Sequence, residues 1–234
     1  TVGNDVDKCG ANVTYSIPEV TDDCPGATIA LTSGPASGNL FAVGATVVTY
    51  TGTDVAGNTA TCAFTVTVND AQVPYIVCPT PMTVNTEAGK CTAVVNNLAP
   101  VQAEDNCPAP NITWVLTGAT TGSGYGDASG QTFNKGVTQL RYRIYDAAGN
   151  DAFCVTTVTV ADNEAPTFSC PAPITVSSCN SVVPNVLAGI TDEADNCSVV
   201  TLTQNPPAGV AFGNISGGST TITVTATDGS GNTS

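Results

Sequence analysis

The chain has 234 residues, with ten cysteines and no histidine, and its five Lys and Arg against nineteen Asp and Glu give a formal charge of −14. A protein this acidic repels phosphates, so the composition excludes nucleic acid as a partner, and it repels anionic lipid surfaces as well. Without imidazole, hydrolases built on histidine and the commonest metal-ligand sets are excluded too.

The remaining composition favours extended chain outside the reducing cytosol. Only 10% of the residues are charged, and Thr, Ser, Asn, Gly, Val and Ala take their place. Such residues favour strands and turns over helices. The cysteines form no paired CxxC motifs typical of zinc sites, so disulfides in an oxidising compartment are the better interpretation. No apolar run reaches the roughly 18 residues of a membrane span, which predicts an extracellular or cell-surface protein without membrane insertion.

The sequence repeats itself with a period of about ninety residues. An Asp-x-x-Gly-Asn motif occurs at 54–58, 146–150 and 228–232, an Asp-Asp/Asn-Cys motif at 22–24, 105–107 and 195–197, and Cys-Pro at 78–79 and 170–171. The phase of these motifs predicts an N-terminally incomplete domain (1–70), a complete domain (71–162) and a C-terminally incomplete domain (163–234). We expect the natural chain to continue, with a further cysteine two positions beyond the last residue.

Strands are expected along most of each unit. Residues 46–51, 65–68, 112–116, 140–145 and 221–225 alternate or concentrate apolar and β-branched residues, a pattern typical of strands. The 54–58 motif is expected to be a hairpin turn, because its Gly and Asn tolerate positive φ. Short strands with Gly- and Pro-rich turns predict an all-β fold of tandem immunoglobulin-like sandwiches, with Trp114 in the core. Residues 119–130 are expected to form a long Gly-rich loop.

The combined motifs resemble a known family. Cys-Pro followed by Ile-Thr-Val, Asp-Asn-Cys, Val-Thr-Tyr-Thr-Gly-Thr-Asp-Val-Ala-Gly-Asn and Phe-Thr-Val-Thr-Val are similar to the HYR (hyalin repeat) family over the whole chain. The resemblance implies immunoglobulin-like modules of extracellular matrix and surface proteins. The extra cysteine of Asp-Asn-Cys resembles versions in very long bacterial surface proteins of the Bacteroidota type.

Strand order predicts how the cysteines pair. The first strand of a sandwich starts at the pole where the last hairpin turns, so Cys78 should lie beside Cys154. The other expected pairs are Cys91–Cys107, Cys9–Cys24 and Cys179–Cys197, with Cys62 and Cys170 bonded beyond the ends of the sequence. A rival scheme, Cys62–Cys78 and Cys154–Cys170, bridges adjacent domains. It requires positions about 20 Å apart, one strand length, to meet within ~6 Å, so we favour pairing within domains.

Acidic residues gather in the Asp-Asn-Cys loops, the hairpin turns and the linkers. If the turn of one unit faces the linker from the preceding unit, these oxygens converge between domains, as Ca²⁺ requires with its roughly six to eight hard ligands. The candidate ligands are Asp70, Glu104, Asp105, Asp146, Asn150, Asp162, Asn163, Glu164, Asp195 and Asp228. Turn chemistry is the alternative, because Asp at the first position of a turn hydrogen-bonds its own backbone. Both interpretations stay open.

We therefore expect a non-enzymatic structural or adhesive segment of an extracellular fibre or adhesin stalk. Its partners would be neighbouring repeats of the same chain, other fibre chains, or a cell-surface or glycan ligand. The alternative is a ligand-binding adhesion module, in which one copy carries a distinctive loop such as 119–130 with Tyr125. No polar constellation breaks the repeat pattern in the way that a catalytic site would.

Overall fold

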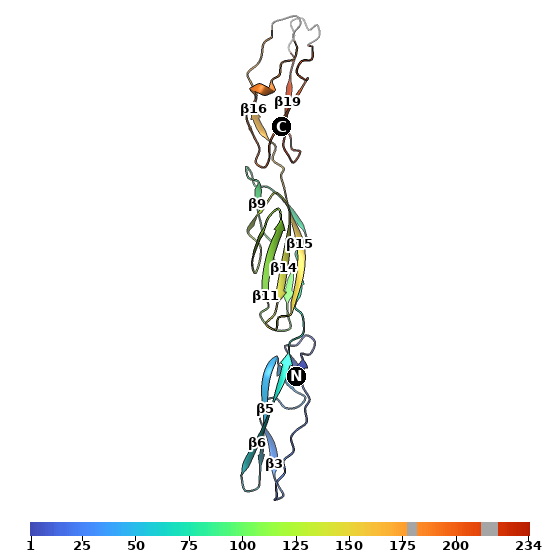
Figure 1. Cartoon of the computed structure of the whole chain (residues 1–234), viewed down its shortest axis with the longest axis vertical. Helices are drawn as coiled ribbons and strands as arrows, with labels where there is room; N and C mark the ends of the chain where they lie inside the picture. The colour runs from blue at the N-terminus through green and yellow to red at the C-terminus, as the bar shows by residue number, and fades with distance from the viewer. Residues whose placement is uncertain (177–181, 212–219) are drawn as a thin grey trace.

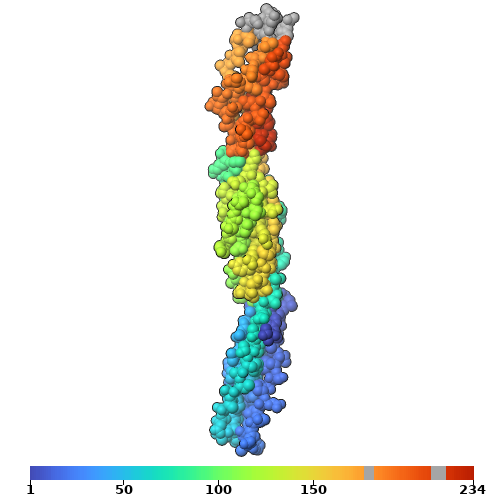
Figure 2. Space-filling model, viewed as in Figure 1, coloured from blue at the N-terminus to red at the C-terminus, as the bar shows by residue number. Residues whose placement is uncertain are grey.

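The computed structural model describes residues 1–176, 182–211 and 220–234. Three bodies of strands follow one another along one long axis (Figures 1 and 2). We call them module 1 (1–70), module 2 (71–162) and module 3 (163–234), after the predicted boundaries. Over the described residues the regular secondary structure consists of strands and a single 3₁₀ turn, η1 (Leu187–Gly189). The expected all-β array of sandwiches is confirmed. None of the described helical structure is long and apolar enough to cross a bilayer.

Module 1 is a sandwich of a large and a small sheet. Its strands are β1 (Val2–Gly3), β2 (Gly10–Asn12), β3 (Thr28–Ser33), β4 (Leu40–Ala42), β5 (Gly44–Thr53) and β6 (Thr59–Asn69). The four-stranded sheet has the order β1-β6-β5-β3, and β2 pairs with β4. Residues of both sheets bury one another in a single core: Ala11, Phe41, Val48, Tyr50, Val66 and Val68.

Module 2 repeats this plan with longer strands. Its strands are β7 (Tyr75–Val77), β8 (Met82–Asn85), β9 (Thr92–Val95), β10 (Gln102–Glu104), β11 (Asn111–Gly118), β12 (Gly122–Tyr125), β13 (Gln131–Asn134), β14 (Gly136–Tyr145) and β15 (Asp151–Ala161). The main sheet has the order β12-β11-β14-β15-β8, and β7 with β10 and β9 with β13 form two small sheets. Along β14 buried and exposed residues alternate strictly from Val137 to Ile144, so one face packs inward and the other meets water.

One buried polar side chain, that of Tyr142, forms hydrogen bonds within the core of module 2. Tyr142 is fully buried. Its hydroxyl donates a hydrogen bond to the Leu98 carbonyl at 2.7 Å and accepts one from the Ala128 N–H at 2.9 Å. These bonds tie the loops around β9 and β13 to the main sheet, and burial raises the pKa of Tyr142 to about 12.

Residues 119–130 differ from the expected loop. Part of this segment is strand β12, which pairs antiparallel with β11 and forms the edge of the main sheet. Trp114 lies in the core as expected, with 6% of its surface exposed. Its indole packs against Gly124, where an added Cβ would lie only 2.5 Å from the ring. Glycine in this segment therefore makes room for the tryptophan, and a high glycine content does not mark a loop here.

Module 3 is smaller over its described residues. Its strands are β16 (Thr167–Ser169), β17 (Thr191–Ala194), β18 (Thr201–Asn205) and β19 (Thr223–Thr227). β16 pairs with β17, and β18 pairs with β19. The buried apolar side chains are those of Val183, Val186, Ile190 and Ala226.

Candidate functional site at the module junctions

Strand direction places the loops of module 2 at its two poles. β10 runs antiparallel to β7, with Glu104 opposite Tyr75, so the Asp-Asn-Cys loop that follows β10 lies where the chain enters the module. β8 runs parallel to the end of β15, with Asn85 opposite Ala161, so the loop from Thr86 to Cys91 lies where the chain leaves. Each junction therefore brings the exit loop of one module to the Asp-Asn-Cys loop of the next.

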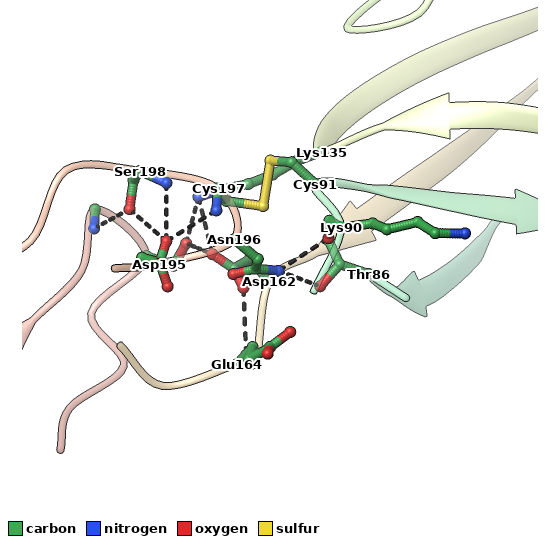
Figure 3. The surroundings of a disulfide bond; sticks show 12 residues. Thr86, Lys90, Cys91, Lys135, Asp162, Glu164, Asp195, Asn196, Cys197 and Ser198 are labelled. Atoms are coloured by element: carbon green, nitrogen blue, oxygen red, sulfur yellow. Dashed lines mark hydrogen bonds and ion pairs between the residues drawn. A yellow bond between two sulfur atoms is a disulfide. The ribbon is translucent and has the colours of Figure 1, made fainter. Parts of the chain in front are cut away.

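Disulfides join these two loops at both junctions. Cys9 of module 1 bonds to Cys107 of module 2, and Cys91 of module 2 bonds to Cys197 of module 3, each pair with a Cα–Cα distance of 4.7 Å. Figure 3 shows the second bond between the two modules. Each junction thus has two covalent connections, the peptide linker and a disulfide.

The cysteine assignment from sequence is correct for one pair. The Cys78–Cys154 disulfide is present within module 2. The expected pairs Cys91–Cys107 and Cys9–Cys24 are wrong, because Cys91 and Cys107 lie at opposite poles of one module and Cys9 is bonded to Cys107.

The Cys179–Cys197 pair is also wrong, since Cys197 bonds to Cys91. Cys179 itself lies outside the described residues. The rival scheme is excluded as well, because Cys154 bonds to Cys78 and because Cys62 and Cys170, like Cys24, are exposed thiols within the described chain. Bonds from Cys62 and Cys170 to cysteines beyond the sequence stay a prediction.

Asparagine amides reinforce each junction in the same way. The Asn106 side chain donates to the Lys8 carbonyl at 3.0 Å, and Asn150 donates to the Asp70 carbonyl at 3.2 Å. At the second junction the Asn196 side chain donates to the Lys90 carbonyl at 2.9 Å, and the Asn232 side chain donates to the Asp162 carbonyl at 3.0 Å. All four amides donate to backbone carbonyls of the preceding module, and Asn106 and Asn196 also donate to its side chains, Asp70 at 3.3 Å and Thr86 at 3.4 Å.

Carboxylates converge at the first junction. The carboxylates of Asp70 and Asp105 and the sulfur of Cys107 lie within 4.8 Å of one another. The sulfur is committed to a disulfide, so the metal-ligating atoms here are oxygens. Burial, together with the charges of Asp70 and Asp146, raises the pKa of Asp105. One oxygen of Asp105 and the amide oxygen of Asn106 are closed off from solvent and accept no hydrogen bond within the described chain.

The second junction repeats this arrangement. Carboxylate oxygens of Asp162, Asp195 and Asp228 lie within 4.8 Å of one another, and Figure 3 shows Asp162 and Asp195 beside the disulfide. The ammonium of Lys135 pairs with Asp162 at 3.2 Å, and the Asp162 side chain is fully buried. Burial alone would raise the pKa of Asp162, but bonds from Ser230, the Glu164 N–H and Lys135 outweigh it and lower this pKa.

Hairpin aspartates also serve their own turns. Asp146 accepts bonds from the N–H groups of Gly149 and Asn150 and from the Asn150 amide at 2.7–2.8 Å. Asp54 makes equivalent bonds to Asn58, although it lies in an exposed turn away from both junctions. Turn chemistry therefore accounts for the aspartate at this position, and the Asp228 turn adds a carboxylate to the second cluster.

Five predicted ligands lie outside the clusters, and two of them, Asp146 and Asn150, bond to each other in the hairpin turn. Glu104 is exposed at the end of β10. Asn163 donates to the Asn85 side chain at 2.9 Å, and Glu164 accepts from the Gly89 N–H at 2.7 Å. The two linker residues thus hold the exit loop of module 2 and do not face the carboxylates. Sequence reasoning missed Asn106, Asn196 and Lys135, and the recurrence of Asn in Asp-Asn-Cys was the signal for the first two.

Comparisons with known proteins agree with this architecture. The HYR domain model matches residues 3–68 and 69–160. Hyalin of Lytechinus variegatus is 29% identical over 243 residues, covering 97% of this chain and 42% of that protein. Hyalin of Strongylocentrotus purpuratus is 30% identical over 237 residues, covering 94% and 18%. The chain therefore spans less than half the length of either relative.

Comparison with solved structures finds cadherin-type ectodomains at low similarity. The human mucin-like protocadherin EC1-2 structure gives a TM-score of 0.33 at 14% identity, covering 69% of this chain and 94% of that one. The human desmocollin-1 ectodomain gives 0.27 at 11% identity, covering 100% and 56%. The family match spans both of the first two modules, junction included, and on that match the chain belongs to the HYR domain family.

Proposed function

We propose that this chain is a non-enzymatic structural segment of an extracellular adhesive fibre or stalk, whose task is to hold consecutive modules in a fixed line. One observation carries the proposal: both junctions are closed by the same disulfide between an exit loop and an Asp-Asn-Cys loop. A single linker lets two bodies swing, whereas a second covalent tie beside it restricts bending. Disulfides persist in oxidising compartments, which supports the extracellular location.

The linkers support the same role. Pro74 and Pro166 follow directly on the linker segments, and proline fixes its own φ and biases its predecessor to extended geometry. The Ser234 hydroxyl donates to the Pro166 carbonyl, so the second linker is held against module 3. The extra cysteine of the Asp-Asn-Cys motif forms the disulfide that joins the modules. Because this cysteine resembles the versions in very long bacterial surface proteins, we propose that the chain is a segment of such a protein.

Calcium is the second part of this proposal. The residues at both junctions fit it, because buried carboxylate oxygens converge there and because Asp105 and Asn106, like Asp195 and Asn196, each hold a solvent-excluded oxygen without a hydrogen-bond donor. Hard carboxylate and amide oxygens are the ligands that Ca²⁺ prefers. A cation there would neutralise repulsion between carboxylates contributed by two modules, and so stiffen the junction.

Small-angle X-ray scattering on the full chain tests the structural role. The variant Cys9→Ala/Cys107→Ala should scatter as a broader distribution of end-to-end lengths than the wild type, because its first junction keeps only the peptide linker. Cys78→Ala/Cys154→Ala is the matched control, since it removes a disulfide within a module and leaves both junctions closed. Identical length distributions for the wild type and the junction variant would contradict the proposal.

A second candidate function is ligand binding by the outer sheet face of module 2. Arg141 and Arg143 are exposed on β14, and the Arg141 guanidinium lies 4.0 Å from the ring centre of Phe153 on β15. Tyr125 is 83% exposed and lies on the edge strand β12, opposite Thr113 of β11. Modules 1 and 3 carry threonine at the positions of both arginines: Thr49, Thr51, Thr223 and Thr225.

The net charge of −14 opposes anions at long range, but the arginines and aromatic rings of this surface support an acidic glycan as a ligand bound at short range. Arginine presents a planar fork of donors to carboxylate or sulfate, and aromatic rings stack beside it. Arg143 is already paired with Asp151 at 2.7 Å, which leaves Arg141 as the cation free of an ion pair among the described residues. Retention on a heparin column should fall for Arg141→Thr and stay unchanged for Lys90→Thr. Equal retention of the two variants would rule this function out.

A further inference from the structure

The two junctions are built alike but differ in one charge. In module 2 the Lys135 N–H bonds to the Cys91 carbonyl at 3.1 Å, and in module 1 the Val43 N–H bonds to the Cys9 carbonyl at 3.3 Å. Lys135 and Val43 therefore occupy the same backbone position, each directly beside its junction disulfide. Lys135 is a cation and Val43 is apolar, so the carboxylates near them experience different electrostatic fields.

At the first junction no cation balances the acids. None of the ion pairs among the described residues involves Asp70, Asp105 or Asp146. The solvent-excluded oxygens of Asp105 and Asn106 lack hydrogen-bond donors within the described chain. This cluster therefore holds buried oxygens, excess negative charge and nothing to neutralise it.

At the second junction Lys135 occupies that role. Its ammonium contacts both Asp162 and the Ser230 hydroxyl, and Ser230 in turn donates to Asp162 at 2.8 Å. The first junction has Val43 for the lysine and Ala148 for the serine. The Lys135 ammonium thus lies among the equivalent carboxylates of the second junction. This independent observation indicates that the carboxylates of the first junction can hold a cation too.

We infer that the first junction binds calcium more tightly than the second, and that Lys135 sets the difference. The inference rests on the proposed calcium role. Calcium affinity follows the net charge of its ligand set. At the first junction the Asn150 amide holds Asp146 beside Asp70, so three carboxylates counting Asp105 stand there without a cation. At the second junction Lys135 offsets the charge of one of three carboxylates and repels an incoming divalent cation at close range. The second junction is therefore partly neutralised by the chain itself, whereas the first depends on the ion.

Calorimetric titration of calcium into the full chain tests this. The wild type should show two classes of site whose affinities differ by at least about tenfold, the effect of one nearby charge in a partly buried cluster. Lys135→Met keeps the length of the side chain and removes its charge, so the weaker site should approach the affinity of the stronger. Val43→Lys should weaken the stronger site.

Lys90→Met is the matched control. Lys90 lies at the same junction, in the exit loop of module 2, but its ammonium pairs with Glu87 and points away from Asp162 and Asp195 (Figure 3). Both affinities should stay as in the wild type. Because Val43 is half-buried, the melting temperature of Val43→Lys must be checked first, and Lys135→Met decides alone if that variant is unfolded.

Two identical sites in the wild type, or unchanged affinities in Lys135→Met, would overturn the inference. Absence of calcium binding in every variant would overturn it together with the calcium part of the proposed function. The disulfide-closed rod would remain, because the scattering experiment, repeated with a chelator, measures it independently of calcium.

Discussion

The Cα atoms of Cys9 and Cys107 lie 4.7 Å apart although 98 positions separate the two residues in the sequence. The disulfide between them joins two modules and not two strands of one sandwich. Its counterpart, Cys91–Cys197, spans 106 positions and connects the same two loops one repeat further along. A bond that recurs at each junction transmits tension from module to module beside the linker, so module order and module spacing are both fixed covalently.

The disulfide within module 2 should dominate that module's stability. Cys78–Cys154 closes a separation of 76 residues, which corresponds to about 4 kcal/mol in the chain-entropy model. Differential scanning calorimetry of Cys78→Ala/Cys154→Ala should show one transition moved to clearly lower temperature. The junction variant Cys9→Ala/Cys107→Ala should leave that transition nearly in place, and an equal loss in both variants would contradict this division of labour.

The contact of Trp114 with Gly124 predicts a steric effect. Gly124→Ala would place a Cβ 2.5 Å from the indole ring, and overpacking of this kind costs about 1–3 kcal/mol. Gly122→Ala is the control on the same strand, because its Cβ would lie 3.8 Å from the ring, an ordinary contact. Trp114 is the only tryptophan, so urea unfolding followed by its fluorescence reports on module 2. Equal midpoints for both variants would argue against the packing described.

Removal of the Tyr142 hydroxyl should destabilise module 2. Tyr142→Phe leaves the Leu98 carbonyl and the Ala128 N–H without their buried partner, a loss of about 1–3 kcal/mol. Tyr125→Phe, at a residue 83% exposed, should change stability little. Denaturant midpoints measure both. Spectrophotometric titration should also show two tyrosines that ionise near a pKa of about 12, Tyr15 and Tyr142, and Tyr142→Phe should remove one of them.

Asp105 and Asp162 should respond to pH in opposite directions when divalent ions are chelated. The pKa of Asp105 is raised in the folded chain, so its ionisation opposes folding at neutral pH, and stability is gained as the pH falls through that raised pKa. Asp105→Asn should therefore be more stable than the wild type at neutral pH and should lack the gain on acidification.

The pKa of Asp162 is lowered, so its ionised form supports folding above the usual carboxyl range, and that support is lost as the pH falls through the lowered value. Asp162→Asn should be less stable than the wild type at neutral pH. Melting temperatures across the acidic range check both directions, and the same sign for the two variants would show that the junctions are not electrostatically distinct.

Local patterns in the sequence were enough for the fold. The alternation along β14 and the Gly-Asn turns specify strands and hairpins within one short window, and the strand order that follows places Cys78 beside Cys154. The other disulfides could not be obtained in this way. Cys91 and Cys107 share a module and are near in sequence, but β8 and β10 carry them to opposite poles. Pairing between modules depends on how repeats stack, which no local pattern encodes.

The same limit applies to the junction chemistry. Asp70 and Asp105 were expected near one another because a linker and a loop share a pole, and the structure brings them together. Lys135 gave no such signal: its position differs from that of Val43 by one residue type, and its second partner, the Ser230 hydroxyl, belongs to the next module. Side chains that act across a boundary between modules become visible only when both modules are in place.

A peptide map of the native protein tests the central claim most directly. The exposed thiols are first capped with an alkylating reagent, the protein is digested without reduction, and the crosslinked peptides are identified by mass spectrometry. We predict one crosslinked pair that contains Cys9 with Cys107 and another that contains Cys91 with Cys197. A crosslink of Cys91 to Cys107, or of Cys9 to Cys24, would show that the modules are closed upon themselves and would contradict the account.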